Sequence, residues 1–378
     1  MVGVRDVYIA SSSMINVDRH FNRGYKELAG VVVKDVIEGA SVEQPDYIVV
    51  SSMFAESSLN QLDLATILTQ HLGLKPVPAI RVDTGESSGL AAVEIAYSLI
   101  TAGRADTVLV VGVEKATEFP TRVTNRFLSK VLDYEVEVLR NITPPNYAAL
   151  IMKEYMKRYR VSREELTIWP VKMHENALRN PYAQLKFKIT PSKVLNAIKI
   201  SEPITLYDMF PIGDGAAALI LASSKVARKS GREVLLVRDV VSATSRPLYL
   251  RDDITRFESI ATLISMLRRK YGFRIDDAVY EIHDSYSIYA YIILEELGIA
   301  RRGASYKEVE NLVYVNVSGG LKARGHPFGA TGVYQVSEVY NIMVKGAGGV
   351  RFDGTFGLTH SMSGPDYNSR LCLLERVV

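Results

Sequence analysis

The side chains best suited to chemistry stand in a glycine-rich stretch, residues 316–332, which reads NVSGGLKARGHPFGATG. Glycine allows the backbone to approach a ligand closely, and Pro327 stiffens the turn that carries His326. A histidine on such a restricted loop is presented in the manner of a catalytic imidazole. The alternative is a tight strand-to-helix connection with an incidental histidine. The glycines alone favour that alternative, whereas the Gly-His-Pro centre argues against it.

The elements that must position His326 are an apolar strand-like run before the loop and an apolar helix-like run after it. In the second run, apolar side chains at helical spacing predict a helix with one buried face, and they are Val333, Val336, Val339 and Ile342. Elsewhere β-rich runs alternate with helical stretches, which predicts parallel or mixed sheets covered by helices. The expected strands are residues 7–11, 47–52, 80–83, 107–113, 217–221, 235–243, 279–282, 314–317, 356–359 and 371–376. The expected helices are residues 88–102, 147–159, 163–178, 260–271 and 288–297.

Composition narrows the class of protein. A chain of 378 residues that is 47% hydrophobic can bury a large core, and its length suggests two or three domain-sized units. The net charge is only +3, and no block of like charge indicates nucleic-acid binding. The absence of a signal-like segment and of any long apolar run predicts a cytoplasmic protein without a membrane segment. The single cysteine, Cys372, excludes an intrachain disulfide and a multi-thiolate metal site.

Several motifs together resemble one enzyme family. Asn-x-x-Gly-Gly followed by Gly-His-Pro-x-Gly-Ala-x-Gly, in residues 316–332, is similar to the histidine loop of thiolases, which make or cleave carbon–carbon bonds in acyl-CoA thioesters. The segments HDSY at 283–286 and GLTH at 357–360 resemble the sterol-carrier-protein-2-like and archaeal branch. Further similar segments are LVVGVEK at 109–115 and DGAAALIL at 214–221. The resemblance therefore covers nearly the whole chain.

The resemblance implies an α/β thiolase fold. In that fold two similar βαβαβαββ halves stack as a five-layer αβαβα sandwich, and a loop domain inserted in the first half covers the site. The expected halves are residues 1–225 and 226–378, with the loop domain at about 115–203. In this last range Tyr, Asn, Pro and charged residues interrupt the apolar runs, as an insertion above a sheet would require.

The nucleophile of the family is missing from its expected place. The family's Cys-x-Ser-Gly element reads Glu-Ser-Ser-Gly here, which places Glu86 at the position of the cysteine. A second family cysteine, used for proton transfer, corresponds to Ser285. Cys372 lies in an apolar C-terminal run and is expected to be a buried core thiol. Because acyl transfer in the family needs a thiolate, we expect ordinary thiolysis and condensation to be severely impaired.

Glu86 has two interpretations. It is either a general base, which removes a proton α to a thioester carbonyl or activates water for thioester hydrolysis, or a helix cap that satisfies His326 in a site without a reaction. If the two side chains are in contact, an ion pair is expected to raise the pKa of His326 and to lower that of Glu86.

The resemblance assigns further residues to the site. His283 and His326 would polarise a carbonyl oxygen, although His283 alone would be interpreted as a core histidine. Asn316 would hold the histidine loop, and His360 and Gly364 belong to the last site loop, where the Gly364 amide would serve an oxyanion hole. That loop is bulkier here than in the family, which puts the oxyanion hole in question.

Two residues of the expected loop domain, His174 and Asn176, resemble family elements near the ligand channel, and their alternative role is helix capping. No Walker or Gly-x-Gly-x-x-Gly motif predicts nucleotide binding. The histidines are too widely spaced in the sequence to predict a metal site.

The resulting hypothesis is a thiolase-like, acyl-CoA-binding protein of the acyltransferase family that lacks cysteine-dependent chemistry and acts on a CoA thioester through Glu and His. Coenzyme A or acyl-CoA is the expected ligand, with no covalently bound cofactor. The resemblance also implies a homodimer or dimer of dimers and a zinc-ribbon/OB-fold partner protein. The alternative is a non-catalytic scaffold or regulatory subunit of an acyl-CoA-processing complex.

Overall fold

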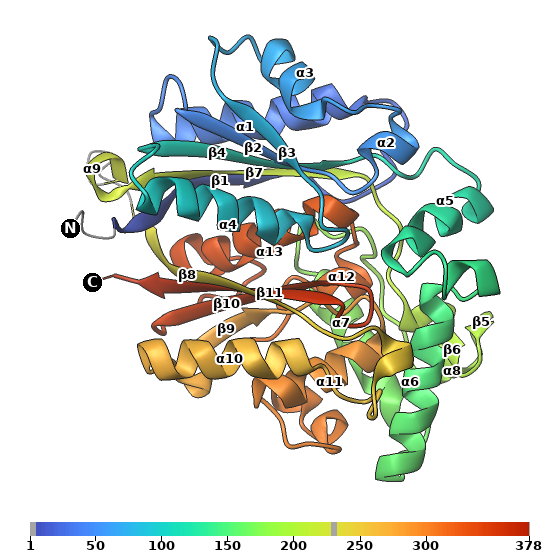
Figure 1. The fold of residues 1–378 in the computed structure, drawn as a ribbon. Coiled ribbons are helices and arrows are strands. Elements are labelled where there is room, and N and C mark those ends of the chain that lie inside the picture. Colours follow the sequence, from blue (N-terminus) through green and yellow to red (C-terminus); the bar gives the residue numbers. More distant parts are fainter. Residues whose placement is uncertain (1–4, 228–232, 378) are drawn as a thin grey trace.

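Two β-sheets stack on each other with helices between them and on both outer faces, in a computed structural model that describes residues 5–227 and 233–377 (Figure 1). The outer helices on the first sheet are α1 (Tyr25–Ala40) and α3 (Leu64–His71). The central layer holds α4 (Ser88–Thr101) and α13 (Thr331–Tyr340). The outer helices on the second sheet are α10 (Glu258–Tyr271) and α11 (Ser287–Leu297). This arrangement confirms the expected αβαβα sandwich.

Hydrogen bonds join nine strands in one continuous mixed order, and a short ladder in its middle links the two stacked sheets. The first has the order β3 (Ala79–Val82), β2 (Tyr47–Ser51), β4 (Thr107–Glu114), β7 (Gly215–Ser223) and β1 (Val7–Met14). The second has the order β8 (Leu235–Thr244), β11 (Asn368–Arg376), β10 (Phe356–Ser363) and β9 (Ala278–Glu281). β1 pairs with β8 only where Val7, Tyr8 and Ile9 face Val237, Leu236 and Leu235. Every residue of β4 and β7 is buried, as their continuous apolar sequences require.

One predicted strand is wrong. Residues 314–317 form no named strand, and only Val315 makes an isolated bridge, to Tyr280. The chain turns at the next residue, because Asn316 has a positive φ of 45°. A left-handed residue cannot continue an extended strand.

Helix α13 is buried more completely than its periodicity predicts. All ten of its residues are buried, so the prediction of a single buried face is too narrow. The helix lies between the two sheets (Figure 1), and packing there leaves none of its own faces directed to solvent.

The central helices touch through glycine. A Cβ atom on Gly89 would lie 2.6 Å from the backbone nitrogen of Gly332, which leaves no room for a side chain. Gly332 is equally restricted, since its Cβ would lie 2.3 Å from the nitrogen of Leu90. This contact brings the beginning of α4, which follows Glu86, against the beginning of α13, which follows the His326 loop.

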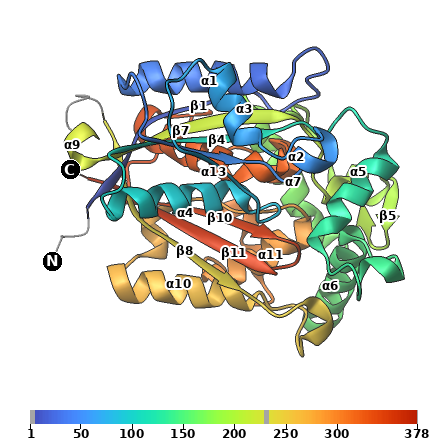
Figure 2. The same ribbon diagram turned by 45° about the horizontal axis from the view of Figure 1, so that its top comes forward.

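The insertion after β4 lies beside the sandwich, at the end where the loops of both sheets meet (Figure 2). In place of the single helix predicted at 163–178, the insertion has a 3₁₀ turn at Glu165–Thr167 followed by the helix α7. The insertion contains α5 (Thr121–Leu128), α6 (Pro144–Tyr159), α7 (Ile168–Ala177), α8 (Pro191–Leu195), β5 (Lys199–Ser201) and β6 (Ile204–Thr205). Among the described residues, the other short α-helices are α2 (Ala55–Ser58), α9 (Ser224–Ala227) and α12 (Gly320–Ala323). The division into halves near residue 225 stays a prediction.

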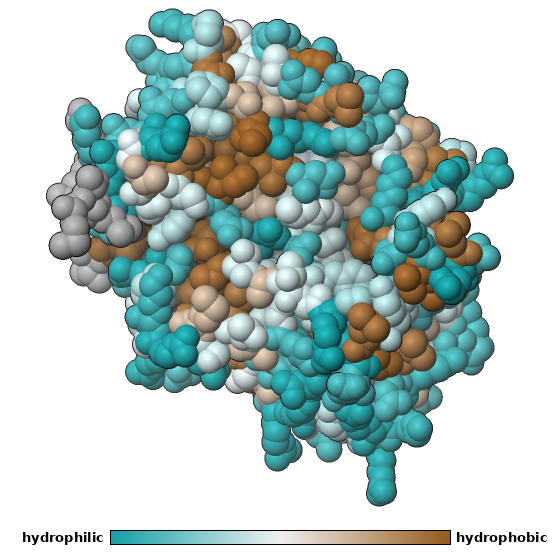
Figure 3. Space-filling model, viewed as in Figure 1, coloured by the Kyte–Doolittle hydropathy of each residue, from teal (hydrophilic) through white to brown (hydrophobic). Residues whose placement is uncertain are grey.

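The face of the molecule seen in Figure 3 is a mosaic, in which hydrophobic patches are separated by hydrophilic side chains. Within the described residues, no helix is both long enough and apolar enough to cross a membrane.

Candidate active site

Glu86 occupies a tight turn between β3 and α4. Gly85 has a φ of +67°, and a Cβ atom there would lie 2.2 Å from the Oγ atom of Ser363. Glycine is therefore required where this turn meets the end of β10. The N–H of Thr84 donates to Ser88 Oγ at 2.8 Å, which closes the turn at the beginning of α4.

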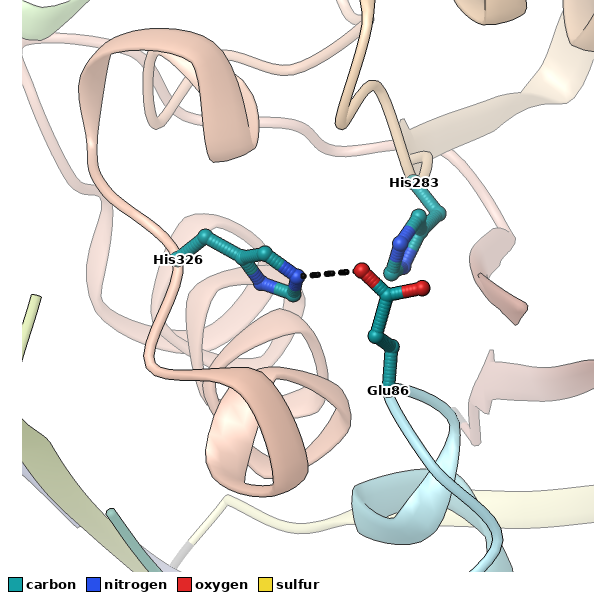
Figure 4. Close-up of side chains that lie close together, drawn as sticks. All are labelled: Glu86, His283 and His326. Carbon is teal, nitrogen blue, oxygen red and sulfur yellow. Dashed lines mark hydrogen bonds and ion pairs between the residues drawn. The ribbon is translucent and has the colours of Figure 1, made fainter. Parts of the chain in front are cut away.

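The carboxylate of Glu86 points across the site (Figure 4). A hydrogen bond of 3.2 Å joins Glu86 Oε1 to His326 Nε2. Glu86 Oε2 accepts the N–H of Gly364 at 3.1 Å. Both hydrogen bonds lead away from the first turn of α4, so the geometry does not support the helix-cap interpretation. The Gly364 amide, expected in an oxyanion hole, donates to Glu86 itself.

Burial dominates the protonation of this pair. Glu86 is only 7% exposed and His326 is fully buried. Burial raises the pKa of Glu86, and it lowers the pKa of His326 well below its ordinary value. The expectation that an ion pair would raise the pKa of His326 and lower that of Glu86 is therefore wrong. Removing either charged group from water costs more free energy than the ion pair regains. A carboxylate with a raised pKa is a stronger base once it is ionised.

The imidazole of His326 is held from several sides. Its Nδ1 atom is hydrogen-bonded to Thr331 Oγ1 at 2.7 Å, which leaves Nε2 directed at Glu86. The rings of Phe210 and Phe328 lie 4.7 Å and 4.8 Å from the imidazole, between ring centres. Sequence reasoning missed Thr331, although its place five residues after His326 in the same motif was a usable signal.

His283 lies beside the pair, in the connection from β9 to α11. Its ring centre is 5.2 Å from that of His326, with the two rings almost perpendicular. It is fully buried, and within residues 5–227 and 233–377 neither of its ring nitrogens has a hydrogen-bond partner. One ligand atom from each of Glu86, His283 and His326 lies within 4.8 Å of the others. The structure thus brings together three predicted residues that are far apart in the sequence.

Asn316 supports this connection. Its Oδ1 atom accepts the N–H of Ile282 at 2.7 Å, and its Nδ2 atom donates to the Ile282 carbonyl at 3.2 Å. Ile282 directly precedes His283, so the Asn316 side chain ties the beginning of the histidine loop to the segment that carries His283. This is wider than the expected role of holding the histidine loop alone.

Two other predicted residues, His360 and Ser285, lie near Glu86, His283 and His326, which are called the triad below. His360 on β10 is buried, its ring centre is 6.5 Å from that of His283, and burial lowers its pKa to about 3. The carbonyl oxygen of Ser285 accepts the N–H of Phe210 at 3.1 Å. Since the Phe210 ring packs on His326, the backbone of Ser285 supports a residue that lies against the site.

Of the two predicted substrate-binding residues, Asn176 connects the insertion to the site, whereas His174 is hydrogen-bonded within the insertion. His174 Nδ1 is hydrogen-bonded to the Phe187 carbonyl at 2.9 Å, and burial lowers the pKa of His174 to about 4. Asn176 Nδ2 donates to the Asn316 carbonyl at 2.9 Å. Contact of either side chain with a substrate stays a prediction.

A cavity of about 290 Å³ approaches the outer side of the Glu86 turn. Thr84, Gly85 and Ser363 belong to its lining, whereas Glu86, His283 and His326 do not. Side chains therefore separate this cavity from the triad.

Cys372 is remote from this chemistry by its packing. It lies on β11, is fully buried, and faces Thr359 and Val240 in the neighbouring strands. Burial raises the pKa of its thiol. It is the core thiol that its apolar neighbours predict.

Comparisons with known proteins agree with this architecture. The family described as "Thiolase, N-terminal domain" matches residues 7–202, and "Thiolase C-terminal domain-like" matches residues 269–376. The acetyl-CoA acetyltransferase of Methanocaldococcus jannaschii is 33% identical over 352 residues, 89% of each chain. That of Methanothermobacter thermautotrophicus is 31% identical and covers 99% of this chain and 100% of its own. Sterol carrier protein 2 of Bos taurus is 29% identical over 84% of this chain and 62% of its own length.

Solved structures show the same fold. The structure described as "Ltp2-ChsH2(DUF35) aldolase" has a TM-score of 0.83 at 19% identity, and it covers 100% of this chain and 99% of its own. Human mitochondrial 3-ketoacyl-CoA thiolase has a TM-score of 0.77 at 16% identity, with coverage of 99% and 100%. With both halves of the sequence pattern matched and relatives of 33% and 31% identity along nearly its whole length, the chain belongs to the thiolase family.

Proposed function

We propose that this protein binds a CoA thioester and that Glu86 removes a proton from the carbon α to the thioester carbonyl, without an acyl-enzyme. One observation carries the proposal. The Glu86 carboxylate stands where the family resemblance places the nucleophilic cysteine, in contact with His326 and with the Gly364 amide. Membership of the thiolase family supports a CoA thioester as the ligand.

The surrounding side chains suit this proton transfer. The α proton passes to Glu86 Oε, and the electron pair moves to the thioester oxygen as an enolate. His283 can donate an N–H to that oxygen, since its ring nitrogens have no hydrogen-bond partner among the described residues. His326, fixed by Thr331, holds the carboxylate in place. The raised pKa of Glu86 brings the base closer to neutral pH, where general bases work best.

Acyl transfer of the ordinary kind finds little support in this site. A carboxylate is a much weaker nucleophile than a thiolate, and an acyl anhydride on Glu86 would hydrolyse readily. The chain's single cysteine lies in the core on β11. Thiolysis and condensation through a thioester intermediate are therefore not part of the proposal.

Hydrogen–deuterium exchange tests the proposal. A panel of acyl-CoAs is incubated with the protein in D₂O, and the masses of the recovered thioesters are measured by mass spectrometry. We expect deuterium at the α carbon of an intact thioester, lost in Glu86→Gln, which keeps the shape of the side chain. If Glu86-dependent release of free CoA appears without exchange, Glu86 activates water for thioester hydrolysis instead, and the proton-transfer proposal is wrong.

A second candidate function is favoured by the closure of the site. His283 and His326 are fully buried, and the cavity beside the Glu86 turn does not reach them. A closed site suits a non-catalytic scaffold or regulatory subunit. In that case acyl-CoA neither exchanges its α protons nor changes the protein's unfolding midpoint.

We also propose that the chain assembles with itself and with a partner. β3 is the edge strand of its sheet, and Ile80 on it is 41% exposed, which suits pairing with a second copy as a homodimer or dimer of dimers. The similar structure whose description pairs Ltp2 with ChsH2(DUF35) supports a search for a small zinc-ribbon/OB-fold partner. Light scattering of the purified chain, alone and with candidate partners, tests both assemblies.

A further inference from the structure

The same three side chains have the composition of a metal site. We propose that Glu86, His283 and His326 bind one divalent transition-metal ion of the Zn²⁺ type and leave one coordination position open. This inference goes beyond the proposed function and does not rest on it, because metal binding is measured without any CoA thioester.

The spacing of the ligand atoms fits such an ion. Zn²⁺ holds nitrogen and oxygen ligands at about 2.0–2.1 Å in a tetrahedron, which places neighbouring ligand atoms about 3.3 Å apart. Glu86 Oε1 and His326 Nε2 are already 3.2 Å apart. All three ligand atoms lie within 4.8 Å of one another. Binding therefore requires the His283 ring to approach by at most about 1.5 Å.

His283 provides an independent sign of a missing ligand. Its imidazole is fully buried, yet within the described part of the chain both ring nitrogens lack a hydrogen-bond partner. Buried polar atoms in proteins are nearly always paired with protein, water or an ion. In Figure 4 this ring stands beside the Glu86 carboxylate, on which His326 also converges.

The other two ligands are oriented as metal ligands usually are. A metal-binding histidine generally gives its second ring nitrogen to another group, which fixes the ring. His326 does so through Nδ1 and Thr331 Oγ1, at 2.7 Å, and keeps Nε2 for the cluster. The Gly364 N–H holds Glu86 Oε2 and leaves Oε1 directed at His326.

The donor set decides the class of ion. Two imidazoles and one carboxylate, with an open position, form the protein part of catalytic zinc sites. Mg²⁺ prefers oxygen ligands, and two of the three ligands here are nitrogen. A bound cation would also occupy the lone pair that Glu86 uses as a base. Metal binding and α-proton removal are therefore alternative states of one site, and exchange should be slower in the loaded protein.

The test uses the full chain, stripped with a chelator and then dialysed. Co²⁺ is the spectroscopic probe, and Zn²⁺ is titrated in competition with a chromogenic chelator. We expect one Zn²⁺ per chain, visible absorption from protein-bound Co²⁺ that Zn²⁺ abolishes and Mg²⁺ does not, and a Zn²⁺-dependent rise of the unfolding midpoint.

Variants assign the ligands. Glu86→Gln, His283→Gln and His326→Gln should each weaken Zn²⁺ binding at least about tenfold, whereas His71→Gln on the exposed face of α3 should not. Thr331→Val keeps all three ligands and should weaken binding by a smaller factor, so it carries the assignment if a ligand variant fails to fold. Absence of stoichiometric Zn²⁺ binding, or binding unchanged in every variant that folds, overturns the inference. The exchange assay is run separately in chelator, so either proposal can fail alone.

Discussion

Two buried glutamates flank the histidine loop, and their surroundings differ in kind. Glu114 at the end of β4 accepts four hydrogen bonds, from the Ser52 hydroxyl and from the N–H groups of Met53, Phe54 and Gly329. Glu86 accepts one N–H, from Gly364, and otherwise meets the imidazole of His326. Burial raises the pKa of both carboxyl groups, that of Glu114 to about 7.

The difference separates a carboxylate with a structural role, Glu114, from the carboxylate that we propose as the base, Glu86. The four donors on Glu114 occupy all the acceptor sites that a carboxylate offers, and they fix Gly329, three residues after His326. Glu86 keeps unused acceptor capacity beside an imidazole, His283, that has no hydrogen-bond partner among the described residues. Burial alone therefore does not distinguish the two carboxylates, whereas the spare lone pairs of Glu86 beside the unpaired His283 do.

The largest expected effect is that of Glu86→Gln on the rate of α-proton exchange. Glu86→Gln removes the base while keeping the shape, and we expect α-proton exchange to fall by about 10²–10⁴-fold. Glu38→Gln on the exposed face of α1 is the matched control and should exchange at the unmodified rate. Exchange that survives in Glu86→Gln would remove Glu86 from the reaction.

The next largest effect is expected on the stability of the variant Glu114→Gln. A glutamine there places an NH₂ group against N–H donors, so at least one buried hydrogen bond is lost. We expect Glu114→Gln to lower the free energy of unfolding by about 1–3 kcal/mol, measured by urea denaturation at pH 8. Unchanged stability would show that Glu114 is not the structural member of the pair.

Glu86→Gln should change stability in the opposite sense. At this site the amide oxygen can accept the Gly364 N–H, and the NH₂ group can donate to His326 Nε2, so both contacts survive. The folded pKa of Glu86 is raised above its ordinary 4.5, so its contribution to stability is present below pH 4.5 and is lost as the pH rises through the folded pKa. The variant avoids this loss. Its stability relative to the unmodified protein should therefore rise with pH above 4.5 and then level off, and a pH-independent difference in thermal unfolding would contradict the raised pKa.

The smallest effect is expected at the cysteine. Cys372→Ala should leave exchange and CoA release unchanged and cost about 1 kcal/mol of stability, since it removes one buried sulfur from the core. Thiol alkylation of the folded protein should also be slow, because the thiol is buried and its pKa is raised. Rapid alkylation with loss of activity would make Cys372 a functional residue.

Much of the fold could be predicted, because many of its strands and helices follow from short stretches of sequence. Apolar runs gave β4 and β7, and the glycine-rich motif gave both the histidine loop and the helix that follows it. The strand expected at 314–317 failed because one left-handed residue, Asn316, ends the extended run. The complete burial of α13 depends on its place between two sheets, which helical periodicity does not reveal.

The sequence predicts which residues come together at the site, but it does not predict their pKa shifts. The family motifs located Glu86, His283 and His326, and the fold places them together. The expected directions of the pKa shifts of Glu86 and His326 are wrong, because desolvation depends on how completely the pocket excludes water. The same limit applies to the metal site: spacing along the chain argued against it, and only the folded chain shows the three ligand atoms converging.

Thiolysis of acetoacetyl-CoA by the unmodified protein tests most directly the claim that no thiolate serves at this site. Acetyl-CoA formation is followed beside the archaeal acetyl-CoA acetyltransferase from Methanocaldococcus jannaschii and the variant Glu86→Cys. We predict no cleavage above the protein-free rate for the unmodified chain, and a covalent acyl-enzyme, visible by intact-protein mass spectrometry, for Glu86→Cys but not for the unmodified chain. Cleavage by the unmodified protein at the rate of the archaeal enzyme would contradict the account.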